Sequence, residues 1–417
     1  MMPDPMLDRL PLDYANPPAL SARAQLRTTY VIEGLLSFAA NLLFIGIFFY
    51  TTQVFHWGLV RNFALAAAQG AVYVVASLAS EKLAKALGAR RLLIVAQAGL
   101  AVVSLVGVLS HDRLVLTAAI IAYVPLTALN WPVLEAASAA TADPHRMSRQ
   151  IGTYNLIWAG TGALAVAVQG TILKFDPRGV FLVPLAIHLA IIGIIAGTRG
   201  YGEDVTADAP AADAPAHPDP EPALVAQRTL ALWLSRIALP STYVVIYSLS
   251  ALMPLLPVMR RLDPTAQTMV GSAWMVSRWV CFWVLGATLF WHARPRLLLL
   301  ATIGMGAAFV GVTAPWGLAA MIASQVLLGA ALGLIYTASL YFGMVLSEGS
   351  TEHAGYHEAL IGVGQVLGPG AGALTQYRWP QSLTAGVVAV SSLVCVSIVG
   401  AVVATVRASG RRGDERA

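Results

Sequence analysis

Long apolar runs dominate this sequence, and short polar connections separate most of them. A helix needs about 20 apolar residues to cross a hydrocarbon core of ~30 Å, because each residue rises about 1.5 Å and every backbone polar group must be paired within the segment. The chain meets this length repeatedly. The pattern predicts twelve membrane-spanning helices, at 29–50, 62–79, 91–109, 114–138, 151–173, 179–197, 230–257, 267–290, 296–313, 318–345, 355–376 and 382–405.

Composition agrees with this pattern. Hydrophobic residues make up 57% of the 417 residues and charged residues only 11%, whereas a soluble globular domain carries about 25% charged residues. The expected fold class is therefore an all-α integral membrane protein. Two cysteines, Cys281 and Cys395, fall inside predicted spans. No Cys-x-x-Cys or Cys/His spacing accompanies them, so we expect no metal site and no cofactor.

One connection, at residues 200–229, is long, rich in Ala, Pro and Asp, and free of any apolar period. We expect it to be a disordered cytoplasmic linker. The predicted organisation is a cytoplasmic N-terminal tail (1–28), an N-terminal six-helix bundle (29–199), this linker (200–229), a C-terminal six-helix bundle (230–406) and a basic cytoplasmic tail (407–417). A weak similarity between the stretches that begin at Gly152 and Gly355 indicates that the bundles are pseudo-repeats.

The placement of arginine and lysine predicts the orientation, because cytoplasmic loops carry an excess of both. With the N-terminus inside, 17 of the 26 lie in cytoplasmic segments, seven lie outside, and Arg236 and Arg278 lie within spans. The first 28 residues lack the apolar core of a cleavable signal peptide. Both termini are therefore expected in the cytoplasm, with the protein in a bacterial-type inner membrane. The net charge of +5 is then mostly a topology signal and does not indicate a nucleic-acid partner.

The loop between the second and third spans carries a motif. It reads EKLAKALGARRLL, and the equivalent loop of the second half reads GATLFWHARPRLLL. With Gly88, Arg90 and Arg91 in the first loop, the chain resembles the major facilitator superfamily over about residues 25–408. Lys85 stands where the family motif has an acidic residue. This departure argues against the charge relay that the family usually forms in that loop.

The resemblance implies a fold and a site. Members consist of two six-helix halves that rock around a central site, and their first, second, fourth, fifth, seventh, eighth, tenth and eleventh helices contribute to the path. Candidate cavity residues in those spans are Asn41, Gln69, Tyr73, Asn130, Trp131, Trp158, Tyr247, Trp274, Arg278, Tyr336 and Gln365. Aromatic faces with a few amide and hydroxyl groups suit a small, partly apolar solute.

Arg278 is the most informative of these candidates, because it lies near the middle of the eighth predicted span. A guanidinium keeps its proton, and holding one at the bilayer centre costs roughly 2.5 to 3.5 kcal/mol. Trp274, four residues earlier, could cover it through a cation–π contact. Either Arg278 lines the cavity and favours a substrate with a carboxylate or phosphate group, or it forms a structural ion pair with a carboxylate of another span.

Three carboxylates lie within or at the edge of spans: Glu33, Glu135 and Glu358. All three fall in the cytoplasmic third of their helices, which suits a gate better than a central site. A buried carboxyl can hold a proton near neutral pH, so any of them could couple transport to a proton gradient. The alternative is a static pair with Arg236, Arg149 or Arg146. His357 adjoins Glu358 and could extend a proton relay, or it could belong to a solvated helix start.

The eleventh predicted span contains Gly364, Gly368 and Gly372, one stripe on a helix. Small residues at this spacing let two membrane helices approach closely, so the stripe predicts helix packing. Pro369 follows Gly368 and could bend the helix during gating. The pair is similar to a Gly-Pro signature of the family's proton-driven exporters. In those exporters the pair lies in the fifth helix, whereas here it lies in the eleventh predicted span, and this difference weakens an exporter interpretation.

Together these features predict a transmembrane transporter that moves a small organic solute by alternating access. No G-x-x-x-x-G-K-[ST] loop is present, so energy must come from an ion gradient or from the substrate gradient itself. We favour secondary active transport, with a preference for an anionic or partly apolar substrate. The predicted partners are this small molecule, the lipid bilayer and, if the glutamates titrate, a coupling proton; no protein partner is indicated.

Two other classes compete with this prediction. A transporter-like sensor or scaffold without transport activity is supported by the altered loop motif. An integral membrane enzyme predicts clustered His, Asp or Cys residues, but the eight histidines are scattered and form no H-E-x-x-H pattern. We therefore do not expect an enzyme.

Overall fold

The computed structural model describes residues 21–139, 144–202, 222–288, 290–292, 294–346, 351–382 and 384–414, and every regular element among them is a helix. The first half comprises α1 (Ala22–Phe44), α2 (Ile47–Gln53), α3 (Leu59–Leu87), α4 (Ala89–Leu109), α5 (Arg113–Ala128), α6 (Trp131–Ala139), α7 (Pro144–Phe175) and α8 (Gly179–Gly197). The second half comprises α9 (Pro222–Leu252), the 3₁₀ turns η1 (Met253–Leu255) and η2 (Met259–Arg261), α10 (Pro264–Gly271), α11 (Ala273–Ala287), α12 (Arg296–Thr313), α13 (Leu318–Leu346), α14 (Thr351–Arg378) and α15 (Ala385–Asp414).

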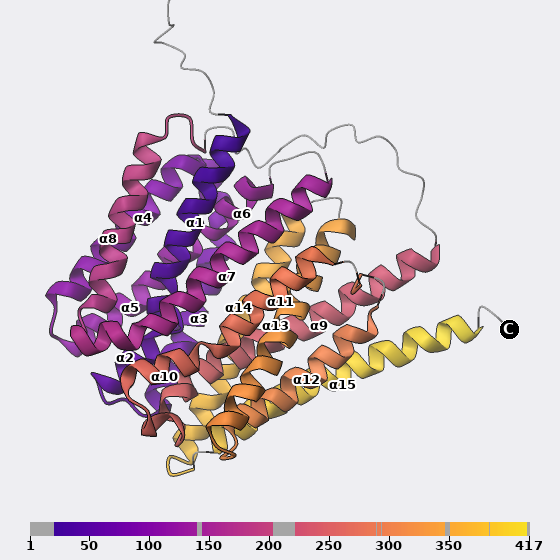
Figure 1. The fold of residues 1–417 in the computed structure, drawn as a ribbon. Coiled ribbons are helices and arrows are strands. Elements are labelled where there is room, and N and C mark those ends of the chain that lie inside the picture. Colours follow the sequence, from indigo (N-terminus) through magenta and orange to yellow (C-terminus); the bar gives the residue numbers. More distant parts are fainter. Residues whose placement is uncertain are drawn as a thin grey trace, which may run out of the picture.

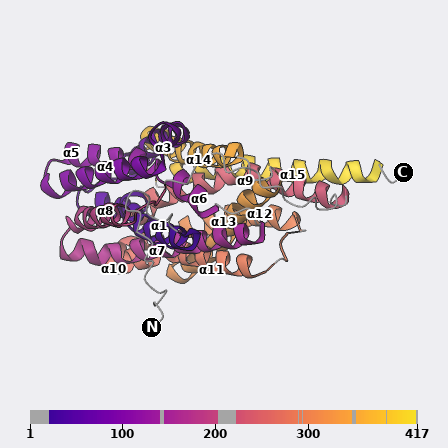
Figure 2. The same cartoon turned by 90° about the horizontal axis from the view of Figure 1, so that it is seen from above.

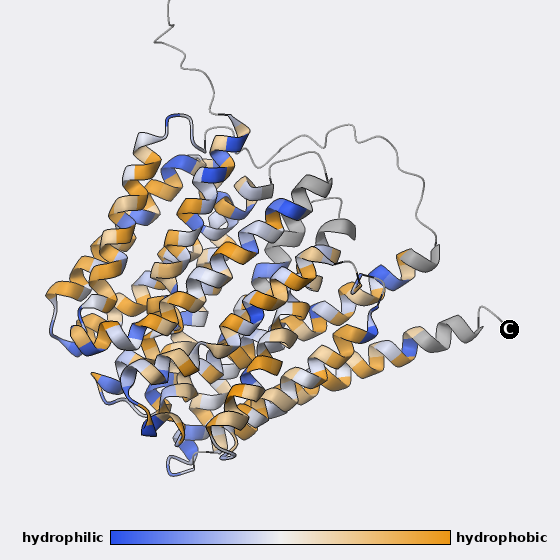
Figure 3. Ribbon diagram, in the orientation of Figure 1, coloured by the Kyte–Doolittle hydropathy of each residue, from blue (hydrophilic) through white to orange (hydrophobic). Residues whose placement is uncertain are grey.

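The chain is an all-α integral membrane protein. Within the described residues, eleven helical segments are long and apolar enough to cross a membrane, and each overlaps one predicted span. The remaining predicted span, 355–376, lies inside α14, a helix of 28 residues that is less apolar than the others because it contains His, Glu, Gln and several Gly. Figure 3 shows hydrophobic residues along the flanks of the bundle and hydrophilic residues towards its ends.

Several spans are interrupted in a way that the apolar pattern did not predict. The first span breaks between α1 and α2, where the side-chain amide of Asn41 donates to the carbonyl of Ser37 and the N–H of Gly46 reaches back to Asn41. The fourth span breaks between α5 and α6, where the side chain of Asn130 donates to the carbonyl of Leu126. Side chains that bond nearby carbonyls compete with the regular helical pattern.

The linker prediction requires one correction. Residues 222–229 were expected in a disordered linker, but α9 begins at Pro222 and includes them. The reason is local: proline is tolerated at a helix start, and the following Ala-Leu-Val-Ala-Gln run consists mainly of good helix formers. Residues 203–221, the central part of the predicted linker, lie outside the described residues, as does most of the predicted N-terminal tail.

Two seams join the halves, and glycine lines both of them. The first runs between α3 and α14, which lie side by side in Figures 1 and 2. Here a Cβ on Gly70 would clash with the backbone of Gln365, so the two helix backbones are in direct contact. The second joins α7 to α10 and α11, and here Gly160 lies against Trp279. Close backbone approach replaces the hydrophobic driving force that lipid removes.

Uncharged hydrogen bonds close one end of the second seam. We call this end, which carries residues 54–58 and 253–263 and lies opposite the start of α1, the distal end. The backbone N–H of Gly170 donates to Thr268 Oγ1 over 2.9 Å, and this hydroxyl donates to the carbonyl of Ala167 over 3.0 Å. The side-chain amides of Gln53 and Gln267 also meet across the halves, at 3.1 Å. No ion pair crosses between the halves in the described part of the chain.

Replacement of Gly170 should open this seam. A Cβ at Gly170 would clash with the carbonyl oxygen of Pro264 and with Thr268 Oγ1, and a backbone atom cannot move aside as a flexible side chain can. Overpacking of this kind costs about 1 to 3 kcal/mol. Gly170→Val should therefore lower the melting temperature of the purified protein and expose the seam. A cysteine placed at Thr265 should then react with maleimide several-fold faster.

The labelling requires a background in which Cys281 and Cys395 are replaced by serine, because these are the native thiols. Gly193→Ala serves as the matched control, since nothing lies within 4 Å of a Cβ at Gly193. Equal labelling rates and melting temperatures for Gly170→Val and the control would show that the seam is not tightly packed.

Candidate functional site

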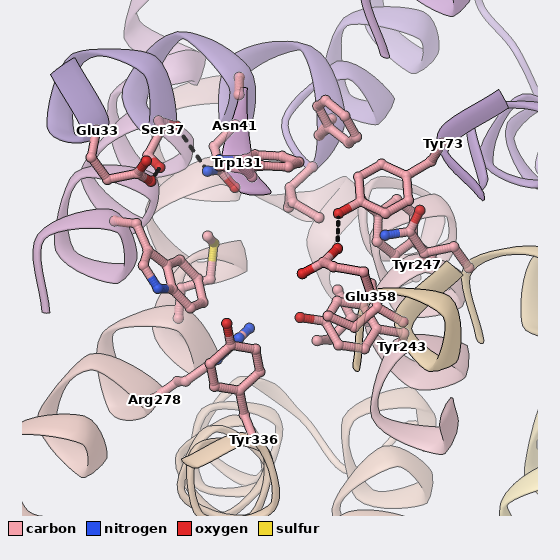
Figure 4. A pocket seen from close by; sticks show the side chains of 18 of the residues that line it. Glu33, Ser37, Asn41, Tyr73, Trp131, Tyr243, Tyr247, Arg278, Tyr336 and Glu358 are labelled. Carbon is pink, nitrogen blue, oxygen red and sulfur yellow. Dashed lines mark hydrogen bonds between the residues drawn. The ribbon is translucent and has the colours of Figure 1, made fainter. Parts of the chain in front are cut away.

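A cavity of about 120 Å³ lies between the two halves. Its wall includes Glu33, Ser37, Asn41, Phe44, Tyr73, Trp131, Glu135, Tyr154, Trp158, Tyr243, Ile246, Tyr247, Trp274, Met275, Arg278, Tyr336, Glu358, Ile361 and Gln365. Helices of both halves therefore contribute, and Figure 4 shows their side chains converging on one space.

Nine of the eleven candidate residues lie on this wall: Asn41, Tyr73, Trp131, Trp158, Tyr247, Trp274, Arg278, Tyr336 and Gln365. Gln69 and Asn130 do not. The side-chain amide of Gln69 donates to the carbonyl of Leu43 over 3.0 Å, inside the first half. Both residues are at the expected depth along their helices, but their side chains bond within the first half and do not line the cavity.

Asn130 belongs to a buried polar chain within the first half. Gln97 donates to Asn130 Oδ1 over 2.9 Å, and the other amide atom of Gln97 contacts His188 Nδ1 at 2.7 Å. His188 Nε2 in turn contacts the hydroxyl of Tyr123 at 2.7 Å. Each of these side chains finds partners here, so the chain satisfies buried polar groups. The placement of Asn130 in the cavity is thus wrong, because its side chain is committed to this chain.

Arg278 lies on α11 with only 5% of its surface exposed, in the cavity wall. Its guanidinium forms no ion pair within the described residues, and Nε and Nη2 have no hydrogen-bond partner there. Three aromatic rings enclose it: the ring centroids of Trp158, Tyr336 and Phe282 lie 4.5, 5.1 and 5.3 Å from Cζ. The expected cation–π partner Trp274 is not one of them, although it also lines the cavity.

The three glutamates lie on the same wall as Arg278, although their depth favoured a separate gate. Glu33 accepts hydrogen bonds from Ser37 Oγ at 2.6 Å and from the hydroxyl of Tyr154 at 2.9 Å. Glu358, on α14, accepts one from the hydroxyl of Tyr73, on α3, at 2.5 Å, so this bond joins the two halves. Glu135 lies within electrostatic range of both other glutamates.

The alternative of static ion pairs is not realised in the described residues. Arg236 is partly buried and Arg149 is exposed, and neither forms an ion pair with a glutamate. The side chain of Arg146 lies outside the described residues. His357 does not line the cavity: its Nδ1 lies 3.2 Å from the hydroxyl of Ser339, and its ring packs edge-on against Tyr336. Of His357 and Glu358, which were expected to form a proton relay, only Glu358 lies on the cavity wall.

The residues of the loop motif take a structural position. Gly88 ends α3 with a positive φ of 81°, a conformation that favours glycine. Arg90 reaches the end of α8 and donates from Nη1 to the carbonyls of Thr198 at 2.8 Å and Tyr201 at 3.3 Å. Arg91 is exposed. Burial raises the pKa of the Tyr201 hydroxyl to about 12, which keeps it protonated at physiological pH.

The glycine stripe of α14 lies against two helices. Gly364 and Gly368 lie against backbone atoms of α9, and a Cβ at either would clash with a carbonyl oxygen there. Gly372 lies against the ring of Phe63 on α3. Pro369 lies inside α14 without ending it. The stripe therefore holds α14 between its own half and the other one.

Several wall residues were missed: Ser37, Tyr154 and Tyr243 among them. A signal for them exists in the sequence. Polar or aromatic residues recur every four positions on three helices, as Glu33, Ser37 and Asn41 on α1, Tyr154 and Trp158 on α7, and Tyr243 and Tyr247 on α9. Residues four apart lie on one helix face, so this spacing marks the face towards the cavity.

A sequence profile of the Major Facilitator Superfamily matches residues 29–369, well over half of the chain. The chain belongs to this superfamily. Membership indicates a membrane transporter with a small-molecule substrate, rather than an enzyme. Comparison with curated proteins finds no match.

Solved structures of transporters share the fold. The human organic anion transporter MFSD10 is 15% identical, with a TM-score of 0.60, over 92% of this chain and 100% of that one. The nucleoside transporter NupG is 11% identical, with a TM-score of 0.62, over 92% and 98%. A bacterial homologue of the human drug peptide transporters PepT1 and PepT2 is 12% identical, with a TM-score of 0.70, over 94% and 100%. At these identities the likeness shows the fold alone.

Replacement of Arg90 should destabilise the protein without changing the cavity wall, to which Arg90 does not contribute. Arg90→Gln removes the donor to two carbonyls at the end of α8, and unsatisfied buried acceptors cost about 1 to 3 kcal/mol. We expect a melting temperature several degrees below that of the wild type, measured on the purified protein. Arg91→Gln is the matched control because Arg91 is exposed. An equal effect of both substitutions would contradict the capping role.

Proposed function

We propose that this protein is a secondary active transporter that moves a small organic solute by alternating access, driven by an ion gradient, with a preference for an anionic or partly apolar substrate. One observation carries the proposal: a buried arginine in the cavity wall with unpaired donors. The cavity lies between the halves, where a rocking motion would expose it to each side of the membrane in turn. Two of the fold relatives are named as transporters of organic anions and of nucleosides.

The surroundings of Arg278 favour a ligand role over a static one. A buried guanidinium is normally stabilised by a carboxylate, but none pairs with Arg278 among the described residues. The rings of Trp158 and Tyr336 supply cation–π contacts instead, at about 0.5 to 2 kcal/mol each. Such contacts hold the planar group in place, and Nε and Nη2 have no partner among the described residues. Its fork geometry matches the two oxygens of a carboxylate or phosphate.

The carboxylates of Glu33, Glu135 and Glu358 are our candidates for ion coupling. They share the small cavity with Arg278 and with the hydroxyls of Tyr73, Tyr154, Tyr243 and Tyr247. An anion that enters this space meets repulsion from any ionised glutamate. Proton uptake by one of them removes that repulsion, so anion binding and proton binding favour each other. This linkage is the physical basis for proton-coupled uptake of an anion.

The orientation follows from the charge distribution of the sequence. We propose that the protein lies in a bacterial-type inner membrane with both termini in the cytoplasm, which makes the distal end the outer side. The hydrogen bonds at Gly170 and Gln53 then close the outer side. A cysteine at Arg61, near the distal end, that reacted with an impermeant thiol reagent only from the cytoplasmic side would contradict this orientation.

A sensor or scaffold remains the second candidate, because the loop motif lacks its acidic residue and Arg90 caps α8 instead. A transport measurement distinguishes a transporter from a sensor or scaffold. A sensor binds its ligand without moving it, so proteoliposomes would retain no ligand beyond the amount bound to protein.

Arg278 variants should separate ligand binding from stability. Ligands that bind the native state raise the melting temperature by mass action. We expect a small organic anion to stabilise the wild type in a screen of anions, neutral solutes and cations, and to stabilise neither Arg278→Gln nor Arg278→Ala. The loss of a charge-assisted bidentate contact should weaken binding by about tenfold or more. Arg178→Gln, which changes an exposed arginine outside the cavity, is the matched control.

A second possible result would show that Arg278 has a structural role. In that case both variants would melt far below the wild type without ligand, and they would still respond to every compound that stabilises the wild type. The anionic preference would then have no support.

Coupling should depend on the cavity carboxylates. With the stabilising anion from this screen, uptake into proteoliposomes should rise several-fold when a proton gradient is imposed. Glu358→Gln mimics the protonated carboxyl permanently, so this variant should bind the anion but lose the response to the gradient. Glu81→Gln, at an exposed ion pair with Lys85, should behave as the wild type. A full gradient response in Gln variants of all three cavity glutamates would exclude them as the coupling site.

A further inference from the structure

The cavity carries both signs of charge, and neither is neutralised by the other. Arg278 approaches it from α11, whereas Glu358 approaches from α14 and Glu135 from α6. Figure 4 shows Arg278 and Glu358 on different sides of the space. Within the described residues they form no ion pair with each other. A buried cation and buried anions that do not pair across a small cavity are both available to a ligand.

We propose that the substrate is amphoteric: a compact, partly aromatic solute whose anionic group binds Arg278 and whose protonated amine binds between Glu135 and Glu358. This inference rests on the proposed function and deepens it, because it retains Arg278 as the ligand of the anionic group and adds the group at the other end of the solute.

The three glutamates differ in how many hydrogen bonds their carboxylates accept from the protein. Both carboxylate oxygens of Glu33 accept hydrogen bonds, from Ser37 and Tyr154. Glu358 accepts one, from Tyr73 to Oε2. No hydrogen bond to the carboxylate of Glu135 occurs within the described residues. Glu135 and Glu358 therefore keep acceptor capacity for a donor that carries positive charge.

These two carboxylates come from opposite halves. Glu135 belongs to the first half and Glu358 to the second, and the two lie within electrostatic range of each other. Like charges at this range repel, so their ionised forms push the halves apart around the cavity. An ammonium group between them reverses the sign of the interaction and holds the halves together. Substrate binding would thus favour closure around the amine.

Ligands that carry a single charge, and inorganic cations, are less complementary to this wall than an amphoteric solute. A plain anion satisfies Arg278 but faces three carboxylates, and a plain cation satisfies the carboxylates but faces a fixed guanidinium. An inorganic cation needs several ligand groups close together, and the described residues contain no cluster of three or more His, Cys, Asp or Glu that could hold a metal ion. The rings of Trp131, Trp158 and Tyr247 suit a flat apolar body between the two charged ends.

Matched probes test this assignment on the purified full-length protein. The first set is 4-(aminomethyl)benzoate with its single-charge analogues 4-methylbenzoate and 4-methylbenzylamine, and the second is phenylalanine with 3-phenylpropionate and phenethylamine. The sets differ in the distance between the two charges. Dissociation constants at neutral pH come from calorimetry, with melting temperatures in parallel. In at least one set we expect the amphoteric compound to bind about tenfold or more tightly than either analogue.

Substitutions test which residues bind each charged group of the amphoteric compound. Arg278→Gln should reduce the affinity for the amphoteric compound to that for the amine analogue. Glu135→Gln and Glu358→Gln should reduce it to that for the carboxylate analogue, whereas Glu81→Gln, at the exposed pair with Lys85, should change nothing. The ratio measured on the wild type does not depend on whether any variant folds.

Each remaining outcome overturns the proposal in a distinct way. Equal affinity for the carboxylate analogue, unchanged by Glu135→Gln and Glu358→Gln, leaves the proposed anion transport intact and removes the amine end. Tightest binding of the amine analogue, unchanged by Arg278→Gln, removes both the amphoteric substrate and the ligand role of Arg278. No binding of any probe in either set excludes this class of substrate while leaving other organic anions to the wider screen.

Discussion

A permanently charged guanidinium inside a membrane protein constrains everything around it. Arg278 cannot lose its proton, and within the described residues no carboxylate pairs with it. Three aromatic rings take the place of a counter-ion, and these rings come from both halves of the molecule, Trp158 from α7 and Tyr336 from α13. The arrangement of the cavity wall is therefore tied to the position of one side chain. Carboxylates lie elsewhere on the same wall, and none of them pairs with Arg278 within the described residues.

The packing that surrounds this cavity is of another kind. Glycine brings the backbones of α3 and α14 into contact at Gly70 and Gln365, and uncharged hydrogen bonds join α7 to α10 around Thr268. Ionisable groups are concentrated in the cavity, where the bond from Tyr73 to Glu358 also joins α3 to α14. The closed end of the second seam depends on shape and on neutral polar contacts. This separation lets the site respond to a charged ligand without a competing network of ion pairs at the closed end of the bundle.

Much of the fold could be predicted from the sequence because the length of an apolar run reports directly on the thickness of the bilayer. Depth along each helix was also predictable, and it placed residues such as Tyr73 and Gln365 on the cavity wall. The set of side chains that reach the wall was less predictable, because a side chain at a suitable depth can bond neighbouring groups instead of facing the cavity. Gln69 and Asn130 have suitable depth but bond within the first half. The glutamates were expected at a gate because they lie in the cytoplasmic third of their predicted spans, but the cavity extends to all three.

The neutral character of the distal seam has an electrical consequence. Moving one elementary charge through a membrane potential of 100 mV changes its energy by about 2.3 kcal/mol. The hydrogen bonds at Gly170 and Gln53 carry no formal charge, so breaking them displaces no charge through that field. The membrane voltage can therefore act on this protein mainly through the charged groups inside the spans, Arg236, Arg278 and the cavity glutamates, together with whatever charged ligand the cavity holds. Whether a transport cycle is sensitive to voltage is then decided by the occupancy of the cavity, and the opening of the seam itself is electrically silent.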